Sequence, residues 1–173
     1  MLELHTERLS FRTLVEADWP LFYRLHREPK TMRYVFGELA DAEIRRGFEH
    51  RLPAWTPHAE HWLCLVASER GSGQAVGVTG FRIMAPGHAE VGTLLVPEHQ
   101  GRGYGTDCRQ AIIGYARDIG LESLESTVTD GNVASCRVLE KCGFVFERRV
   151  THAHQIDGQW FDDLIYRYRI AAV

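Results

Sequence analysis

The sequence has no long apolar run and no closely spaced pair of cysteines. A membrane-spanning helix needs about 18 or more consecutive apolar residues, so no membrane partner is expected. Met1–Leu14 mixes acidic and basic residues with apolar ones, which is not typical of a secretory signal peptide. The four cysteines lack C-x-x-C spacing, and we therefore expect reduced thiols in a cytoplasmic protein.

A strong excess of charge of one sign is also missing. Lys and Arg number 20 against 23 Asp and Glu, a formal net charge of −3, so nucleic acid is not an expected partner. The run from His58 to His61 departs from the H-E-x-x-H zinc pattern, and we expect no metal. With 173 residues, 45% of them hydrophobic, the chain is predicted to form a single domain, residues 1–173, with a sizeable core.

One stretch, from Ala89 to Thr106, organises the rest of the chain. Its first part is short and apolar, as expected of a buried central strand. Gly101, Gly103 and Gly105 follow, and glycine lets main-chain N–H groups approach a ligand closely. A helix with one apolar face is predicted from Thr106 to Ile119. A glycine turn that leads into a helix N-terminus predicts an anion site, because free N–H groups and the helix dipole favour phosphate.

Two nucleotide-binding patterns do not fit this stretch. The dinucleotide fingerprint G-x-G-x-x-G needs a third glycine where Thr106 stands, and a P-loop needs a lysine that this region lacks. The remaining pattern is Gln100-x-x-Gly103-x-Gly105. It resembles the acyl-CoA pyrophosphate loop of the GNAT acetyltransferases.

A second motif lies one helix and one strand beyond the glycine loop. Asn132-Val133-Ala134-Ser135, followed by Leu139-Glu140-Lys141-Cys142-Gly143-Phe144, is similar to a segment of the ribosomal-protein-alanine N-acetyltransferase (RimJ/RimL-like) branch of that family. Two linked motifs in this order make the resemblance strong. It covers most of the chain and is tightest from Glu90 to Phe144.

The resemblance implies an α/β (α+β) GNAT fold with a mixed, mostly antiparallel central sheet flanked by helices. In this family the central strand carries a bulge and splays away from the next parallel strand, which frees N–H groups for the pantetheine arm of acetyl-CoA. The cofactor-binding residues implied here are Leu94, Leu95, Val96, Gln100, Gly101, Arg102, Gly103, Tyr104, Gly105, Thr106, Asn132, Ser135 and Lys141. For Arg102, a solvated loop charge is the alternative.

Acetyl transfer to an amine needs donors for the thioester oxygen, a base for the ammonium group and an acid for the leaving thiolate. Many relatives place a tyrosine acid seven residues after the asparagine, but Leu139 stands there in this chain. The resemblance therefore points to Ser135 as the acid, unless Ser135 only bonds the helix cap.

The base is predicted among three residues. Glu90 opens the central strand and could hold an amine or a water chain, or be a solvated carboxylate. In some relatives the base lies on the penultimate strand, where this chain has His152 and His154. His154 is the closer match, and imidazole suits proton removal at neutral pH. A gap of one residue would move the match to the opposite face of the strand.

The remaining pattern predicts the order β-α-α-β-β-β-α-β-α-β-β. Strands are expected at Leu4–Leu14, Trp62–Ala67, Ala75–Met84, Leu124–Thr129, Phe144–His154 and Trp160–Ile170, and helices from Glu16 to before Pro29, from Ala42 to Leu52 behind an Asp41 N-cap, and from Asn132 to Lys141. Asp157-Gly158 marks a tight turn between the last two strands. Met32, Tyr34, Val35 and Phe36 are candidates for the acceptor wall, or ordinary core residues.

We therefore expect an N-acetyltransferase that moves an acetyl group from acetyl-CoA to a primary amine by direct attack in a ternary complex. The acceptor could be a protein N-terminus, a polyamine or a small amine. Two alternatives stay open: a non-catalytic acyl-CoA-binding module, because the usual tyrosine is missing, and the transfer of a longer acyl group. The final hairpin could offer an exposed edge for a homodimer.

Overall fold

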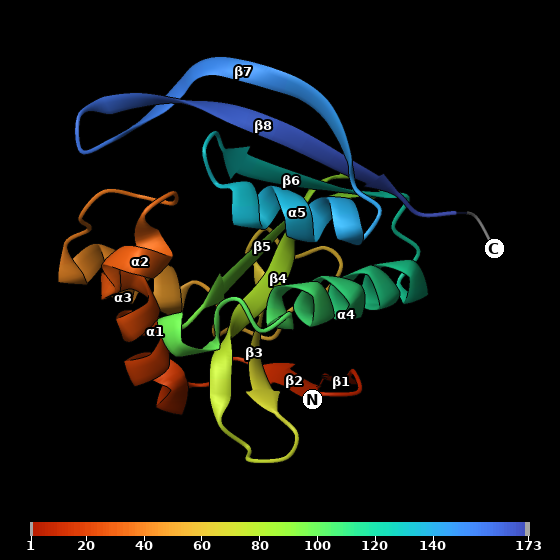
Figure 1. The fold of residues 1–173 in the computed structure, drawn as a ribbon. Helices are drawn as coiled ribbons and strands as arrows, with labels where there is room; N and C mark the ends of the chain where they lie inside the picture. Colours follow the sequence, from red (N-terminus) through yellow and green to blue (C-terminus); the bar gives the residue numbers. More distant parts are fainter. Residues whose placement is uncertain (1, 172–173) are drawn as a thin grey trace.

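An eight-stranded sheet forms the centre of the computed structural model, which describes residues 2–171. The strands follow the order β1-β2-β3-β4-β5-β6-β8-β7, as Figure 1 shows, and only β5 and β6 are parallel neighbours. The strands are β1 (Glu3–His5), β2 (Leu9–Thr13), β3 (Leu63–Glu69), β4 (Ala75–Ala85), β5 (His88–Leu95), β6 (Ser123–Thr129), β7 (Val145–Ile156) and β8 (Gln159–Arg169). The expected mixed, mostly antiparallel sheet is confirmed.

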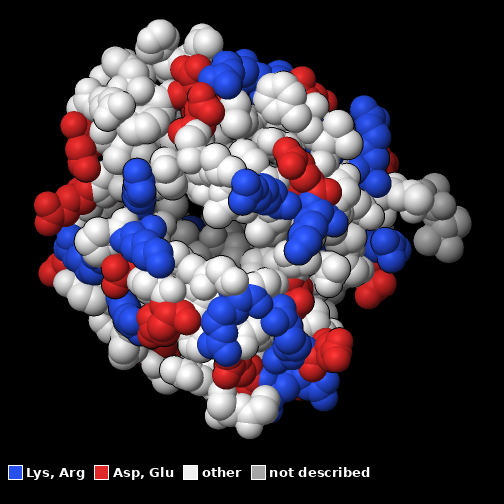
Figure 2. Space-filling view, in the orientation of Figure 1, with Lys and Arg blue, Asp and Glu red and all other residues white. Residues whose placement is uncertain are grey.

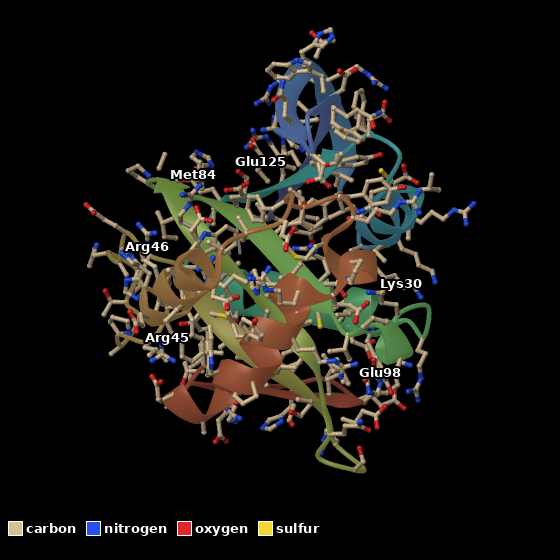
Figure 3. All side chains as sticks on the ribbon, turned by 90° about the vertical axis from the view of Figure 1, so that its left-hand side faces the viewer. Lys30, Arg45, Arg46, Met84, Glu98 and Glu125 are labelled. Carbon is tan, nitrogen blue, oxygen red and sulfur yellow. The ribbon has the colours of Figure 1, made fainter. Side chains whose placement is uncertain are left out.

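Helices cover both faces of this sheet. They are α1 (Trp19–Arg27), α2 (Pro29–Met32), α3 (Asp41–Glu49), α4 (Tyr104–Asp118) and α5 (Val133–Lys141), with short 3-10 turns at Glu16–Asp18 and Pro97–His99. In Figure 3 the helices α1–α3 lie in front of the sheet, whereas α4 and α5 lie behind it. Each face has its own core: Phe81, Val91 and Ile112 are buried on the α4 side, and Phe22, Phe48 and Val66 on the α1–α3 side.

The first strand differs from the expectation. Leu4–Leu14 is not one strand but a hairpin of β1 and β2, in which Glu3 pairs with Arg12. Thr6 closes the turn, because its main-chain N–H donates to the carbonyl of Leu9 and its hydroxyl accepts from the N–H of Leu9. The polar run from Thr6 to Arg8 breaks the apolar alternation at this turn.

The start of α3 also differs. Asp41 is the first residue of the helix and not its cap; the cap is Ala40, whose N–H donates to the carboxylate of Glu43 at 2.9 Å. The Asp41 carboxylate instead accepts from the Tyr23 hydroxyl and forms an ion pair with Arg27, which ties α3 to α1.

The parallel pair β5–β6 opens after three residue pairs. Pairing runs from His88↔Ser123 to Glu90↔Glu125 and then stops, so the rest of β5 diverges from β6. The implied bulge on β5 is not present: pairing with β4 is continuous from Leu95 to Ala89, and the register shifts only at the far end, between Ile83 and Ala85. The gap arises instead because β6 continues along β8 as far as Thr129↔Asp163.

An ion pair between the buried carboxylate of Asp18 and the partly exposed guanidinium of Arg12 anchors α1 to the sheet. The guanidinium of Arg12 on β2 donates two hydrogen bonds of 2.7 Å to Asp18, and the Val15 N–H donates a third. Burial by itself would raise the pKa of Asp18, but these bonds outweigh it and hold that pKa below its usual value. A carboxyl group with a depressed native pKa stabilises the fold above its unfolded pKa, and this contribution is lost as the pH falls through the native pKa.

We predict that Asp18→Asn lowers the free energy of unfolding by about 2 kcal/mol at pH 7, because hydrogen bonds to a charged group are lost. The difference from the parent should shrink as the pH falls below about 4, where Asp18 of the unfolded chain begins to bind a proton before the native carboxylate does. Urea unfolding at a series of pH values measures both quantities. The control is Asp41→Asn, since exposed ion pairs contribute about 0–1 kcal/mol. Equal losses in the two variants would contradict the prediction.

Candidate active site

The glycine loop presents a row of free main-chain donors at the start of α4. Gly101 and Gly103 adopt positive φ angles of 74° and 83°, and Gly103 is the N-cap of α4. In the described part of the chain, the N–H groups of residues 101–105 have no acceptor. Successive N–H groups around a left-handed glycine form an anion-binding concavity, which the helix dipole reinforces. This geometry suits a diphosphate.

Gln100 braces the loop and does not present its N–H to a ligand. The expected N–H of Gln100 is occupied, because it donates to the carbonyl of Pro97 at 3.2 Å. The side-chain amide of Gln100 donates to the carbonyl of Leu95 and to the hydroxyl of Thr31. Thr31 in α2 donates to the same carbonyl at 2.9 Å. The end of β5, the loop and α2 are therefore held together at one point.

Basic side chains stand beside these donors. Arg102 contacts the buried His99 at 3.0 Å and lies 3.4 Å from the carboxylate of Glu69. Arg8, in the turn between β1 and β2, donates to the carbonyl of Arg102, and its guanidinium lies 4.8 Å from the ring centre of Tyr104. Sequence reasoning missed Arg8, because only the paired strands bring that turn to the loop.

The end of β5 offers fewer free donors than expected. The prediction of a free N–H at Val96 is wrong, since this group donates to the carbonyl of Val76 at 3.0 Å. Hydrogen-bonded and non-bonded pairs alternate in an antiparallel ladder, so Leu94 also directs its N–H toward β4. By the same alternation, Thr93 and Leu95 direct theirs toward the opened side. Of the three N–H groups expected to be free, only that of Leu95 points to the opened side, and the N–H of Thr93 points there as well.

The start of α5 borders the gap between β5 and β6 on the side opposite the β5 edge. The Asn132 side chain caps α5 by accepting a 3.2 Å hydrogen bond from the Ser135 N–H, as expected of an N-cap. Leu139 is fully buried in the core on the α4 side. Lys141, at the far end of α5, lies about 13 Å along the helix axis from Asn132, so the two residues would contact different parts of one ligand.

Two carboxylates and a histidine converge on the α1–α3 side of the gap. Glu90 on β5 accepts from Arg82 at 3.0 Å and lies 3.5 Å from the hydroxyl of Thr127. Asp163 on β8 lies 3.1 Å from the Nδ1 atom of His154. Burial raises the pKa of Asp163. The charge of His154 lowers it, and the negative charge of the nearby Glu90 raises it further. The last effect is a repulsion between two carboxylates across the gap.

The structure brings His154 and not His152 to this cluster. The register between β7 and β8 shifts between Val150 and His154, and His152 in this irregular segment has a φ of 47°. His154 then pairs with Phe161 and shares a face with Asp163 and Thr129, whose hydroxyl lies 3.4 Å from Nε2 of His154. Sequence reasoning missed Asp163, because only the pairing of β8 with β6 places it opposite the end of β6.

The expected acceptor wall is divided. Met32 is buried like a core residue, whereas 53% of Phe36 is exposed. The carbonyl of Tyr34 accepts from the Thr129 hydroxyl at 2.8 Å, which ties this segment to the end of β6. Figure 2 shows the molecule hollowed between the α1–α2 side and α5, with Lys and Arg side chains around the opening.

Comparison with known proteins identifies the family. Residues 8–145 match the family model of the acetyltransferase (GNAT) domain, and the chain belongs to this family. It is therefore an acyltransferase, and the cofactor of the family is acetyl-CoA. No described helix has the length and apolar character that a membrane crossing would need.

Three similar proteins illustrate the family. The uncharacterized N-acetyltransferase YoaA of Bacillus subtilis (strain 168) is 29% identical over 166 residues, 94% of each chain. Spermidine N-acetyltransferase from Vibrio cholerae, solved in complex with CoA and spermine, has a TM-score of 0.82 and 19% identity over 95% of this chain and 97% of its own. Ribosomal-protein-S5-alanine acetyltransferase from Vibrio fischeri has a TM-score of 0.78 and 16% identity over 98% and 97%. At these identities the structural likeness shows the fold alone.

We predict that Gly103→Ala weakens CoA binding by about tenfold or more. An alanine there is strained by roughly 1–2 kcal/mol because of the positive φ, which displaces the N–H groups of the loop, and the Arg8 guanidinium, 2.9 Å from the new Cβ, must move aside. Gly120→Ala is the matched control, because Gly120 has a φ of 79° but open space around it at the other end of α4. Calorimetric titration with CoA and thermal melting separate the effects. Equal CoA affinity in both variants would contradict the assignment.

Proposed function

We propose that the chain transfers an acetyl group from acetyl-CoA to a primary amine by direct attack in a ternary complex. The observation that carries this proposal is the opened β5–β6 pair. It has the free donors of residues 101–105 at one end and the cluster of Glu90, Asp163 and His154 on the α1–α3 side. A cofactor and an acceptor that approach from these two sides would meet in the gap.

In this proposal the diphosphate binds the loop amides, with Arg8 and Arg102 beside it. The pantetheine arm runs along the opened edge of β5 and bonds the N–H groups of Thr93 and Leu95. Asn132 and Ser135 at the start of α5 contact the arm from the opposite side. Lys141, two turns further along α5, reaches the nucleotide end of the cofactor. Electrostatic stabilisation of the thioester oxygen falls to main-chain donors of β5.

The chemical step divides between the two sides of the gap. Glu90 holds the acceptor ammonium, and His154 accepts its proton, so that the neutral nitrogen attacks the thioester carbonyl. The carbon–sulfur bond then breaks, and the departing sulfur takes a proton from the Ser135 hydroxyl, which regains one from solvent. Asp163 stabilises the His154 imidazolium that forms at 3.1 Å from it.

The acceptor class is proposed as a protein N-terminus, a polyamine or a small amine. Carboxylates on this face of β5, β6 and β8, namely Glu90, Glu125 and Asp163, would attract a cationic amine. A closer relationship to the ribosomal-protein-alanine branch is proposed on the basis of the motif from Asn132 to Phe144.

Two further proposals concern the whole protein. The four cysteines are free in the structure, in keeping with action in the cytoplasm. A homodimer is proposed through β7, the edge strand of the sheet, which exposes Val145, Phe146 and Val150.

The proposal predicts that the chain releases free CoA from acetyl-CoA only when an acceptor amine is present. A thiol-release assay with an alanine-terminated peptide, spermidine and a small amine, each with acetyl-, succinyl- and longer acyl-CoA, measures this. Acetyl-CoA should give the highest kcat/KM with at least one amine. Binding of CoA without turnover above hydrolysis would favour the non-catalytic alternative, and a preference for another thioester would favour the longer-chain one.

We predict that His154→Gln lowers kcat by about 10²-fold or more and leaves the Kd for CoA unchanged, because the proton acceptor is lost. Glu90→Gln should raise the KM of the amine as well, since it removes the charge that holds the ammonium. His152→Gln is the control, because His152 lies on an exposed irregular segment two residues away. An unchanged kcat in His154→Gln would remove His154 from the mechanism.

A further inference from the structure

A second hollow lies on the α1–α3 side, next to the cluster described above. It has a volume of about 440 Å³ and lies between α3, the segment before β3, and β4. Its walls include Arg46, Arg51, Arg82 and Trp62, together with Glu43 and Glu60. Apart from Arg82, which touches Glu90, none of these residues has a role in the proposal above.

The Trp62 indole is the link between this hollow and the active site. Its ring centre lies 5.9 Å from the guanidinium of Arg51 and 5.7 Å from that of Arg82, which suits cation–π contact on both. A Cβ atom on Gly92 would lie 3.3 Å from the Trp62 ring. Gly92 follows Glu90 by two residues on β5, so the hollow adjoins the point at which β5 and β6 part.

Three arginines line the hollow together with the carboxylates of Glu43 and Glu60, and a third carboxylate, Glu90, pairs with Arg82. Burial, with a contribution from the nearby Arg82, lowers the pKa of Arg51, and the hydrogen bond from its side chain goes to the carbonyl of Gly47. Arg46 has no ion-pair partner within residues 2–171. The Nε atom of Arg82 is buried without a hydrogen-bond acceptor. Glu43 is committed to the cap of α3.

We infer that this hollow binds the carboxylate of the acceptor, so that the substrate class is a zwitterionic α-amino acid and not a simple amine. The inference rests on the proposed function. Glu90 and Arg82 place a carboxylate and a guanidinium 3.0 Å apart, which matches the adjacent ammonium and carboxylate of an α-amino acid. Arg46 and Arg82 bind the carboxylate, Glu90 holds the ammonium, and the face of Trp62 accepts an apolar side chain.

In this arrangement, the carboxylate of the acceptor is required for recognition. The Nε atom of Arg82 is buried without an acceptor, and a site with unpaired polar groups disfavours an analogue that lacks the partner group. Arg46 provides a clean probe, since it lines the hollow but contacts neither Glu90 nor the gap. Figure 3 shows Arg45 and Arg46 at different positions along the outer side of α3, and Arg45 pairs with Glu16 and Glu49.

The test compares L-leucine, L-leucinamide and 3-methylbutylamine as acceptors with acetyl-CoA. These probes share the side chain and differ in the carboxylate, which is present, masked as a neutral amide, or absent. We expect kcat/KM for L-leucine to exceed the other two by about tenfold or more, although the amine of the amide is less basic and more often neutral. Arg46→Gln should erase this preference through KM, and Arg45→Gln, with the same change of charge on the same helix, should keep it.

A binding measurement separates this inference from the proposed function. Titration of the CoA-loaded protein with N-acetyl-L-leucine should show binding that Arg46→Gln weakens about tenfold, and N-(3-methylbutyl)acetamide should not bind. Equal kcat/KM for the three acceptors, or a preference that survives in Arg46→Gln, overturns the carboxylate subsite and leaves the acetyltransferase proposal intact. Absence of turnover with every amine overturns the proposed function. If N-acetyl-L-leucine then still binds and this binding depends on Arg46, the carboxylate subsite is upheld. If N-acetyl-L-leucine does not bind either, both the proposed function and the subsite are overturned.

Discussion

The early end of the parallel pair β5–β6 is the constraint on which the rest of the structure depends. Main-chain N–H and C=O groups are obligatory hydrogen-bonding groups, and a strand that leaves its neighbour must find them other partners. Beyond Glu90, β5 keeps β4 on one side and has no strand on the other. The opened edge is therefore a half-finished ladder. A ligand with amide groups along its length, such as the pantetheine arm, can complete it as a further strand would.

A half-finished ladder needs a rigid support, and Gln100 supplies one. Its amide and the hydroxyl of Thr31 both donate to the carbonyl of Leu95, the last residue of β5. The same side chain stands at the start of the glycine loop, so the loop amides and the strand edge are fixed relative to each other. Gly105 completes the support: its missing side chain lets Val138 of α5 approach to 3.4 Å from where a Cβ would lie. The glycines of this loop thus serve packing as well as ligand approach.

The sequence predicts those parts of the site that are formed by residues close together in the chain. The apolar run, the glycine turn and the helix that follows it, as well as the Asn132 cap, depend on residues within a few positions of one another, and the structure has them where expected. The position of Arg8 beside the glycine loop and the convergence of Asp163 and His154 on Glu90 depend on pairing between strands that are distant in the sequence. Counting back from the Asp157-Gly158 turn gives His154 as the closer match, but only the structure shows that the extra residues of β7 between Val150 and His154 place His154, and not His152, next to Asp163.

The partners of Glu90, Glu125 and Asp163, three carboxylates on the α1–α3 side of the gap, explain why these residues would have unequal roles. Glu90 is paired with Arg82, and Glu125 with Arg167 at 2.6 Å. A guanidinium does not give up its proton at any pH that a protein experiences, so these two pairs cannot change charge during a reaction. Asp163 instead lies 3.1 Å from a histidine, the side chain that most often transfers protons in catalysis. In the proposed mechanism, a proton released by the amine is therefore held at His154, where Asp163 compensates the new charge, while Glu90 keeps its negative charge to bind the next ammonium group.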